Sequence, residues 1–511
     1  MTAKKVLLII LDGWGLGAPD ESNPIHVVNP ANFRWLAENY PLTSLQASGI
    51  AVGLPWGEVG NSDVGHLTIG AGKVVYQYYP KITMAIEDGS FYENPVLQAA
   101  CAHAKTNGSA LHLAGLLTKT NVDAAISHLQ SIMKLAEQAG VPAIKLHLFS
   151  DGKDSPPRTV GELLKRVPRE RVVTLSGRHY AMNRSDNWTL TQKTYDIMTS
   201  ANAPVAADLD ATLKALYAKS LSEEFLPPTR LSEASAIADG DALLFFNFRE
   251  DSILQLAEAF ALPDFDKFAV QPYQNLYVAT LTQYSSKLPC PSAFTPDTVE
   301  EPLGQVLAEA GKAQMRIAET YKHAHVTYFF NGHREAPFQG EYRVLIPSLV
   351  NPHPDEHPEL MAAAITDRVL ETIQNRAFDF ILVNYSNPDT IAHTGNYDAC
   401  LQAVRVVDEQ LGRILKVVPE SDYAVVITSD HGNMEEVISP VTGQIETQHD
   451  ANPVPLYLVA PELKGRRFFN YNNLRNETTG ILADVAPTIL ELMGLSKPAE
   501  MTGHSLLRDL M

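Results

Sequence analysis

The sequence predicts an α/β protein built on a doubly wound parallel sheet, with a second α/β domain inserted into the first. Three observations predict this class. Short apolar segments end repeatedly in polar turns, apolar residues at helical spacing lie between such segments, and the middle of the chain repeats this alternation with different residues. At 511 residues, 45% hydrophobic and 19% charged, the chain is long enough for about two to four domains with substantial cores.

Three apolar segments of the outer domain are typical of strands buried on both faces. They span residues 6–11, 380–385 and 424–428, and polar residues follow each of them directly. The segment between the last two predicts a helix, because its apolar residues recur at helical spacing: Ala403, Val404, Val407, Leu411, Ile414 and Leu415. A strand, helix, strand order favours parallel pairing.

The middle of the chain is expected to form its own domain. Apolar segments at 144–149 and 242–247 again end in polar residues. The joints are expected at 76–80 and in the proline-bearing stretch 289–302. These joints predict an outer domain of residues 1–76 and 298–511, and an inserted domain of residues 77–297.

Composition and charge exclude several classes of function. A net charge of −19 and an isoelectric point near 5.3 repel nucleic acids and anionic lipids. No apolar run reaches the ~18 residues that span a bilayer, and the N-terminal run is too short for a signal peptide. Three widely spaced cysteines suit a reducing compartment. A cytoplasmic monomer without nucleic-acid or membrane partners is therefore expected.

Aspartates and histidines at the predicted strand ends form a candidate metal site. Ligands of parallel α/β sheets lie beyond the carboxyl ends of the strands, so these side chains should converge. Mixed carboxylate and imidazole ligands suit Mn²⁺ or Zn²⁺. The candidate ligands are Asp12, Asp389, His393, Asp430, His431 and His449.

Ser62 is the candidate nucleophile. It lies in a glycine-rich turn before a predicted helix, where backbone N–H groups can hold an anion. A nearby metal would lower the pKa of its hydroxyl, although serine in such a turn is by itself more typical of a helix N-cap. Lys322 precedes another apolar run and would suit charge compensation of a transferring phosphoryl group.

Six motifs together resemble the cofactor-independent phosphoglycerate mutases of the alkaline phosphatase superfamily. They are LLIILDGWG (7–15), GNSDVGH (60–66), AETYKHAHVTYFFNG (318–332), NPDTIAHTG (387–395), TSDHGN (428–433) and HDANPVP (449–455). The resemblance spans almost the whole chain and implies an alkaline phosphatase-like fold with two divalent metals. Mn²⁺ is the first candidate, and Mg²⁺, Zn²⁺ or Co²⁺ are alternatives. It assigns one metal to Asp389, His393 and His449, and the other to Asp12, Ser62, Asp430 and His431.

The resemblance also implies the activity and its residues. Ser62 would take the phosphoryl group from 3-phosphoglycerate or 2-phosphoglycerate in glycolysis, and the glycerate would recover it on its other hydroxyl. Lys322 would compensate charge, and Asp154 resembles the acid/base residue of the family. Arg184 and Arg249 match substrate-binding arginines.

The inserted domain departs from the family pattern. Asp123 stands where a substrate-contacting histidine is expected, and Lys153 replaces an arginine. Two further arginines are missing at Leu190 and Ser252. Each lost charge-assisted hydrogen bond could cost about 1.5 to 3 kcal/mol. Either cations such as Lys119 and Lys153 compensate, or the substrate differs.

Three alternative functions therefore stay open beside the phosphoglycerate mutase. One is a related phosphomutase or phosphotransferase that acts on another small phosphate or phosphonate. A second is a metal-dependent phosphomonoesterase, in which water attacks the phosphoserine. The third is a non-catalytic binding protein, which the presence of Ser62 beside a full set of metal ligands disfavours.

Overall fold

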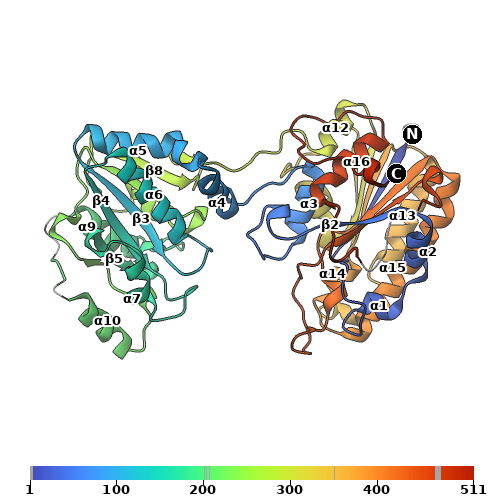
Figure 1. The fold of residues 1–511 in the computed structure, drawn as a ribbon, viewed down its shortest axis with the longest axis horizontal. Coiled ribbons are helices and arrows are strands. Elements are labelled where there is room, and N and C mark those ends of the chain that lie inside the picture. The colour runs from blue at the N-terminus through green and yellow to red at the C-terminus, as the bar shows by residue number, and fades with distance from the viewer. Residues whose placement is uncertain are drawn as a thin grey trace. The chain divides into compact units, whose positions relative to one another are not determined.

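The computed structural model describes residues 4–200, 202, 204–206, 208–349, 351–466 and 473–510. The chain divides into two compact units (Figure 1). Unit 1 comprises residues 1–76 and 297–511, and unit 2 comprises residues 77–296. Each unit has its own sheet and its own hydrophobic core.

Unit 1 is built on an eight-stranded mixed sheet. Its five parallel strands are β11, β10, β12, β1 and β13, and β14 then runs antiparallel to both β13 and β2. In spatial order the strands are β11 (Glu341–Ile346), β10 (Gln314–Glu319), β12 (Phe380–Tyr385), β1 (Lys5–Leu11), β13 (Tyr423–Thr428), β14 (Val454–Val459), β2 (Leu42–Gln46) and β15 (Gly480–Ile481).

Helices pack against this sheet (Figure 1). The longest, α15, buries the apolar residues whose spacing predicted it, including Val404, Leu411 and Ile414. The helices of unit 1 are α1 (Pro24–Val28), α2 (Ala31–Asn39), α3 (Ser62–Ala71), α12 (Leu303–Glu309), α13 (Ala362–Asn375), α14 (Asn387–Ala392), α15 (Tyr397–Val417), α16 (Val485–Leu492) and α17 (Leu507–Leu510).

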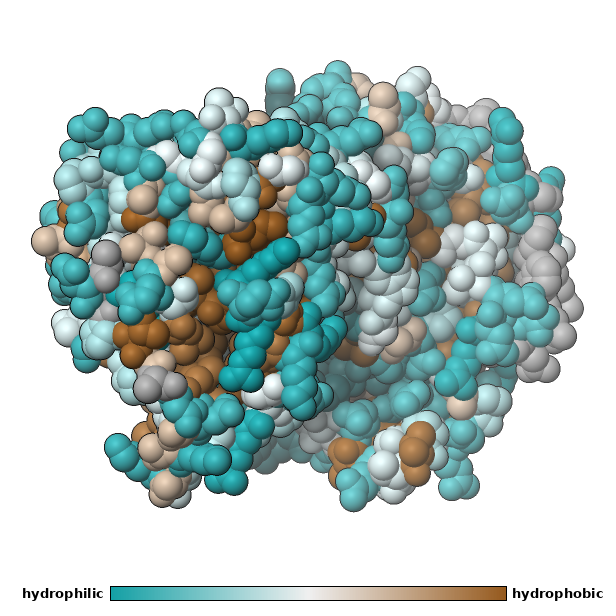
Figure 2. Space-filling model, turned by 60° about the vertical axis from the view of Figure 1, so that its left-hand side comes forward, coloured by the Kyte–Doolittle hydropathy of each residue, from teal (hydrophilic) through white to brown (hydrophobic). Residues whose placement is uncertain are grey.

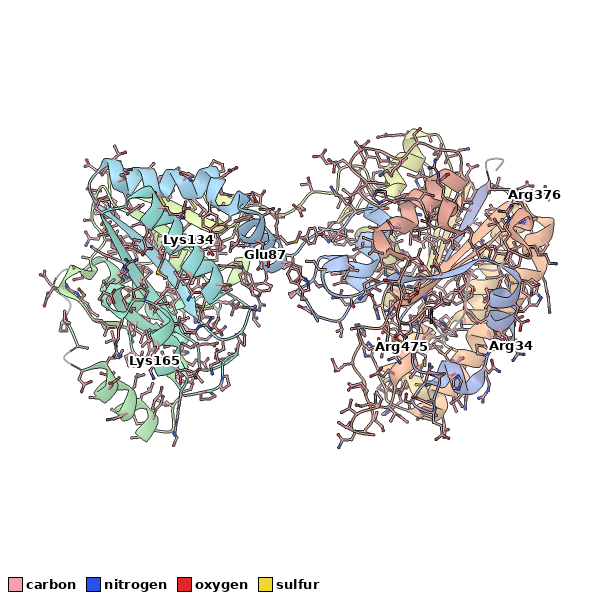
Figure 3. All side chains as sticks on the ribbon, viewed as in Figure 1. Arg34, Glu87, Lys134, Lys165, Arg376 and Arg475 are labelled. Atoms are coloured by element: carbon pink, nitrogen blue, oxygen red, sulfur yellow. The ribbon has the colours of Figure 1, made fainter. Side chains whose placement is uncertain are left out.

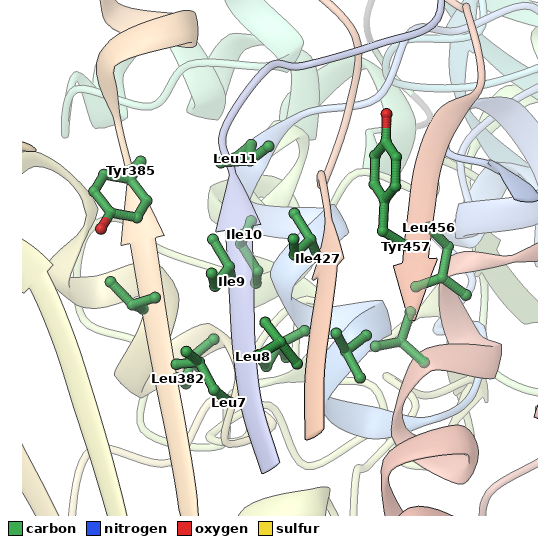
Figure 4. Packing of buried hydrophobic residues seen from close by; sticks show 14 of the residues in the cluster. Leu7, Leu8, Ile9, Ile10, Leu11, Leu382, Tyr385, Ile427, Leu456 and Tyr457 are labelled. Atoms are coloured by element: carbon green, nitrogen blue, oxygen red, sulfur yellow. The ribbon is translucent and has the colours of Figure 1, made fainter. Parts of the chain in front are cut away.

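The central strand β1 is buried on both faces, as its unbroken apolar sequence predicts. It lies between β12 and β13, with Leu8 paired to Leu382 on one side and Ile9 paired to Ile427 on the other. Figure 4 shows these side chains packed on the two faces of the sheet. Because β1 is buried on both faces from Val6 to Leu11, polar residues occur only at its ends, with Lys5 at its start and Asp12 in the turn that follows it.

Unit 2 is built on a seven-stranded sheet that is parallel except for β6. In spatial order its strands are β6 (Thr229–Arg230), β5 (Val172–Gly177), β4 (Ala143–Ser150), β3 (Ala110–Leu117), β7 (Ala242–Phe245), β8 (Tyr277–Thr282) and β9 (Ser292–Phe294). Its helices are α4 (Tyr78–Asp88), α5 (Pro95–Thr106), α6 (Ile126–Ala139), α7 (Val160–Leu163), α8 (Arg178–Ala181), α9 (Trp188–Thr199), α10 (Leu209–Ala218) and α11 (Leu254–Ala261).

The predicted α/β class is confirmed in both units, with two differences in detail. The sequence did not indicate that β14 runs antiparallel to its neighbours. The strand expected at 242–247 ends at Phe245. The Asn247 side chain accepts a hydrogen bond from the backbone N–H of Leu116 at 2.9 Å. This side chain takes the place of a backbone carbonyl of β7 in pairing with β3, so the strand ends here.

The surface is polar, as the composition predicts. Figure 2 shows hydrophilic residues over most of one face, with hydrophobic residues gathered in smaller patches. Charged side chains such as Arg34 and Arg376 in unit 1, and Lys134 and Lys165 in unit 2, are exposed (Figure 3). Among the described residues, no helix is both long and apolar enough to cross a membrane.

Candidate metal centre

The carboxyl ends of three adjacent strands bring the candidate ligands of unit 1 together. Asp12 follows β1, Asp389 lies in α14 directly after β12, and Asp430 with His431 follows β13. Two groups of ligand atoms result, and within each group the atoms lie within 4.8 Å of one another. The groups are Asp389, His393 and His449, and Asp12, Asp430 and His431.

The first group converges on one carboxylate oxygen. Oδ1 of Asp389 lies 3.1 Å from Nε2 of His393 and 3.2 Å from Nε2 of His449. Backbone carbonyls orient both rings, since Nδ1 of His393 donates to Thr447 O and Nδ1 of His449 donates to Gly60 O, each at 2.8 Å. Both Nε2 atoms therefore point to one place, which is how proteins hold imidazole ligands of a metal.

The candidate nucleophile, Ser62, lies beside the second group. Oγ of Ser62 lies 3.1 Å from Oδ1 of Asp12 and 2.9 Å from Nε2 of His431, and all three side chains are buried. Burial lowers the pKa of His431, but the charge of Asp430 and the hydrogen bond with Asp12 outweigh burial and raise this pKa to about 10. Three carboxylates, three imidazoles and a hydroxyl across the two groups fit a pair of divalent cations.

Ser62 is not the N-cap of α3, which was the alternative to its role as nucleophile. Asn61 caps α3, since its side-chain oxygen accepts a hydrogen bond from the backbone N–H of Val64 at 3.0 Å. Ser62 is the first residue of the helix, and its Oγ faces the candidate ligands instead. Because the neighbouring asparagine satisfies the helix end, the serine hydroxyl is left for chemistry.

Lys322 joins the two groups. Its Nζ donates to Asp12 Oδ1 at 2.6 Å, to Asp389 Oδ2 at 2.7 Å and to Ser62 Oγ at 2.8 Å. Burial disfavours the ammonium ion, but Asp12 and Asp389 together raise the pKa of Lys322 well above its usual value. A permanent positive charge thus lies next to the serine oxygen.

Three residues that sequence reasoning missed support the ligands. Asn384 donates to Asp12 Oδ2 at 2.7 Å, and Asn433 donates to Asp389 Oδ1 at 2.8 Å. Nδ1 of His66 lies 3.1 Å from Asp430 Oδ2. His66 and Asn433 belong to two of the six motifs, and Asn384 is the one polar residue near the end of the predicted strand 380–385, so these positions were the available signal.

A separate charged cluster lies at the strand ends of unit 2. Asp123 is fully buried and binds two guanidinium groups, with Oδ2 at 2.7 Å from Arg178 and Oδ1 at 3.2 Å from Arg184. Nε of Arg249 lies 3.7 Å from the same Oδ1. Three arginines therefore converge on one carboxylate.

Arg178 was missed by the sequence analysis, although it is the most deeply buried of these arginines. It also binds Asp151 at 2.7 Å and Asp154 at 2.5 Å. Burial opposes its charge, but the hydrogen bonds to Asp151 and Asp154 raise the pKa of Arg178 above its usual value. Its place six residues before Arg184, which matches a substrate-binding arginine of the family, was the available signal in the sequence.

Lys119 and Lys153, the two lysines that could replace the missing arginines, do not contact Asp123. Lys119 binds Glu162 at 2.9 Å, so its charge is engaged outside the arginine cluster. Lys153 is exposed, and its backbone N–H donates to Asp151 at 3.2 Å. Ser252, at the position of an absent arginine, is fully buried and donates to the backbone carbonyl of Arg249 at 2.7 Å.

The fold and the paired ligand groups define a metalloenzyme of the α/β class, and the family model described as "Metalloenzyme superfamily" matches residues 4–497. The chain is 44% identical to a 2,3-bisphosphoglycerate-independent phosphoglycerate mutase of Pseudomonas putida (strain GB-1), over 99% of each chain. It is 43% identical to that of Synechococcus sp. (strain JA-2-3B'a(2-13)), over 98% of this chain and 96% of the relative. The chain belongs to the family of 2,3-bisphosphoglycerate-independent phosphoglycerate mutases.

A solved structure agrees with this assignment. A structure described as Leishmania mexicana phosphoglycerate mutase at low cobalt concentration is 25% identical to this chain. The match has a TM-score of 0.54 and covers 99% of this chain and 98% of the other.

Proposed function

We propose that this protein is a metal-dependent isomerase that interconverts 3-phosphoglycerate and 2-phosphoglycerate. The observation that carries the proposal is the position of Ser62, whose Oγ lies within 3.1 Å of Asp12, His431 and Lys322. Family membership over the whole chain favours this reaction over the alternative substrates and over phosphomonoester hydrolysis.

The residues of unit 1 are proposed to hold two divalent cations. Asp389, His393 and His449 would hold one, and Asp12, Ser62, Asp430 and His431 the other. Bound cations would lower the pKa of the serine hydroxyl and neutralise oxygens of a phosphoryl group. Mn²⁺ is the proposed metal, because the three carboxylates and the hydroxyl outnumber the three imidazoles in this set.

Ser62 is proposed to accept the phosphoryl group. The bond between phosphorus and the substrate oxygen breaks as the bond between phosphorus and Oγ of Ser62 forms, and the reverse transfer to the other hydroxyl regenerates the serine. The Lys322 ammonium, 2.8 Å from Oγ, stabilises negative charge that develops on the phosphoryl oxygens.

Residues of unit 2 are proposed to bind the glycerate part and to move its protons. Asp154 would donate a proton to the departing substrate oxygen and later take the proton of the other hydroxyl as that oxygen attacks phosphorus. The contact with Arg178, and the hydrogen bond that the Asp154 backbone N–H donates to Asp151 at 3.1 Å, fix the position of Asp154. The anionic groups of the substrate would be bound by Arg184, Arg249 and Lys153. Asp123 would contribute to substrate binding through its contacts with the two arginines.

The setting of the reaction is also a proposal. A glycolytic role follows from the substrate, and a cytoplasmic monomer is proposed. The three cysteines are all free, which suits a reducing compartment.

The test is turnover of 3-phosphoglycerate in the presence of Mn²⁺, followed by phosphorus NMR. Wild-type protein is expected to form 2-phosphoglycerate without free phosphate, and Ser62→Ala is expected to bind Mn²⁺ but form neither product nor phosphoenzyme. Free phosphate alone would identify a hydrolase. Absence of both products, with turnover of another phosphate ester, would refute phosphoglycerate as the substrate.

A further inference from the structure

Three loops of unit 1 carry four of the candidate metal ligands. The first follows β1 and contains Asp12, the second follows β13 and contains Asp430 and His431, and the third contains His449. Such loops have no regular backbone ladder of their own, so the spacing of their ligands depends on contacts between loops.

Glu435 contacts all three loops from behind the candidate ligands. It lies in the turn 434–436 and its side chain is 1% exposed. Its Oε2 accepts hydrogen bonds from the backbone N–H of Gly15 at 2.8 Å and of Asn433 at 3.0 Å. One carboxyl oxygen therefore joins the first loop to the second.

The other oxygen of Glu435 faces the third loop. A Cβ placed on Gly432 would lie 2.3 Å from Glu435 Oε1 and 2.2 Å from Asp450 Oδ1, so the two carboxyl groups meet over this glycine. Asp450 directly follows His449, and its backbone N–H donates to Gly432 O at 3.2 Å. The third loop is thus held to the second beside the histidine ligand.

Two glycines leave the space that this arrangement needs. A Cβ on Gly15 would lie 1.8 Å from Oε1 of Glu435, so a side chain at this position would displace the Glu435 carboxyl group. Burial, and then the charge of Asp450, raise the pKa of Glu435 well above its usual value. A neutral Glu435 can accept hydrogen bonds at one oxygen and donate to Asp450 from the other.

We infer that Glu435 is a positioning residue that fixes the three ligand-bearing loops at the spacing that divalent-metal binding requires. Glu435 belongs to neither group of ligand atoms, so it acts through Gly15, Asn433 and Asp450. Outer contacts of this kind typically change metal affinity by about 10-fold to 100-fold. The inference rests on the metal centre of the proposed function and is independent of the substrate.

The test is the affinity of metal-free protein for Mn²⁺, measured by calorimetric titration. Glu435→Ala is expected to weaken binding at least tenfold, because it removes contacts to all three loops. Glu435→Gln, which keeps the acceptor and supplies an N–H donor towards Asp450, is expected to stay within threefold of wild type. The matched control is Glu436→Ala in the same turn, since Glu436 accepts a hydrogen bond from Asn452 of the third loop at 3.3 Å but does not join the first loop, and the variant is expected to stay within threefold of wild type.

A second readout separates positioning from loss of fold. If Glu435→Ala folds, raising Mn²⁺ should restore kcat while the substrate KM stays near wild type. If it does not fold, Glu435→Asp, one methylene shorter, is expected to show the loss of affinity instead. Wild-type Mn²⁺ affinity in the folded variants, or equal losses in Glu435→Gln and Glu435→Ala, would overturn the inference. If the variants change Mn²⁺ affinity as expected but wild-type protein does not turn over phosphoglycerate, only the proposed function is refuted.

Discussion

At the scale of single residues, one aspartate sets the electrostatics of the charged cluster in unit 2. Arg178, Arg184 and Arg249 face Asp123, and Arg184 and Arg249 also bind the exposed Asp251 at 2.8 and 3.0 Å. The charge that would attract an anionic substrate is therefore largely neutralised within the protein. A substrate carboxylate or phosphate must compete with Asp123 for the same guanidinium groups.

We expect Asp123→Asn to lower the KM for phosphoglycerate about tenfold with a smaller change in kcat. Removal of a buried negative charge frees Arg184 and Arg249, and a tenfold gain corresponds to about 1.4 kcal/mol, within the range of one charge-assisted hydrogen bond. Steady-state kinetics with saturating Mn²⁺ measure this change. Arg178 keeps its contacts with Asp151 and Asp154, so the variant should fold.

Asp251→Asn is the matched control for that substitution. Asp251 binds the same two arginines, but its side chain is 56% exposed, so water already screens its charge. We expect a smaller decrease in KM from it than from Asp123→Asn. An unchanged or raised KM in Asp123→Asn would show that the aspartate does not oppose substrate binding.

At the scale of elements, helix α6 packs a neutral histidine against α4. His128 is fully buried, its Nε2 lies 3.1 Å from Oγ1 of Thr83, and its ring stacks on Tyr79 with centroids 5.5 Å apart. Burial lowers the pKa of His128 to about 3. The folded helix pair therefore excludes a proton that the unfolded chain binds readily.

This lowered pKa predicts an acid-dependent loss of stability in unit 2. As pH falls below the unfolded value of about 6.5, the unfolded chain gains a proton that the folded unit does not, until pH reaches about 3. At pH 5 this proton lowers the free energy of unfolding of unit 2 by about 2 kcal/mol. His128→Phe should reduce the difference between pH 7 and pH 5 by this amount, as measured by hydrogen exchange of α6 and β3 amides in urea.

The wild-type protein will keep part of its acid sensitivity through other buried histidines. Burial also lowers the pKa values of His112 and His147, which contact each other at 2.7 Å. The comparison therefore depends on the difference between the variant and wild type. Equal pH dependence in both would mean that His128 becomes protonated in the folded unit.

At the scale of the whole molecule, the candidate metal ligands and the arginine cluster belong to different compact units. All candidate metal ligands lie in unit 1, and the cluster around Asp123 lies in unit 2. Each unit has a separate core, so each can unfold as its own cooperative unit. A ligand stabilises only the unit whose folded state binds it.

We expect calorimetry of the full chain to show two transitions, of which Mn²⁺ shifts only one. Free Mn²⁺ at one hundred times its Kd should stabilise unit 1 by about 2.7 kcal/mol and leave unit 2 unchanged. Chelation by EDTA should reverse the shift. A single transition that moves as a whole would show that the units unfold together.

The sequence by itself determined the class of the fold and the central strands of unit 1. The segments that form β1, β12 and β13 are continuously apolar because both of their faces are buried, and the residues after them are polar because the strands end there. The rule that parallel strands present their carboxyl ends at one edge then sufficed to expect that Asp12, Asp389 and Asp430 converge.

Only the tertiary structure decided which side chains hold these groups in place. Asn61 rather than Ser62 caps α3, Arg178, which the sequence did not single out, contacts Asp123, and Glu435 lies behind loops that come from distant parts of the chain. Such contacts cannot be predicted from the periodicity of the sequence, because they join residues that are distant along the chain. A single hydrogen bond also requires no particular pattern in the residues around it.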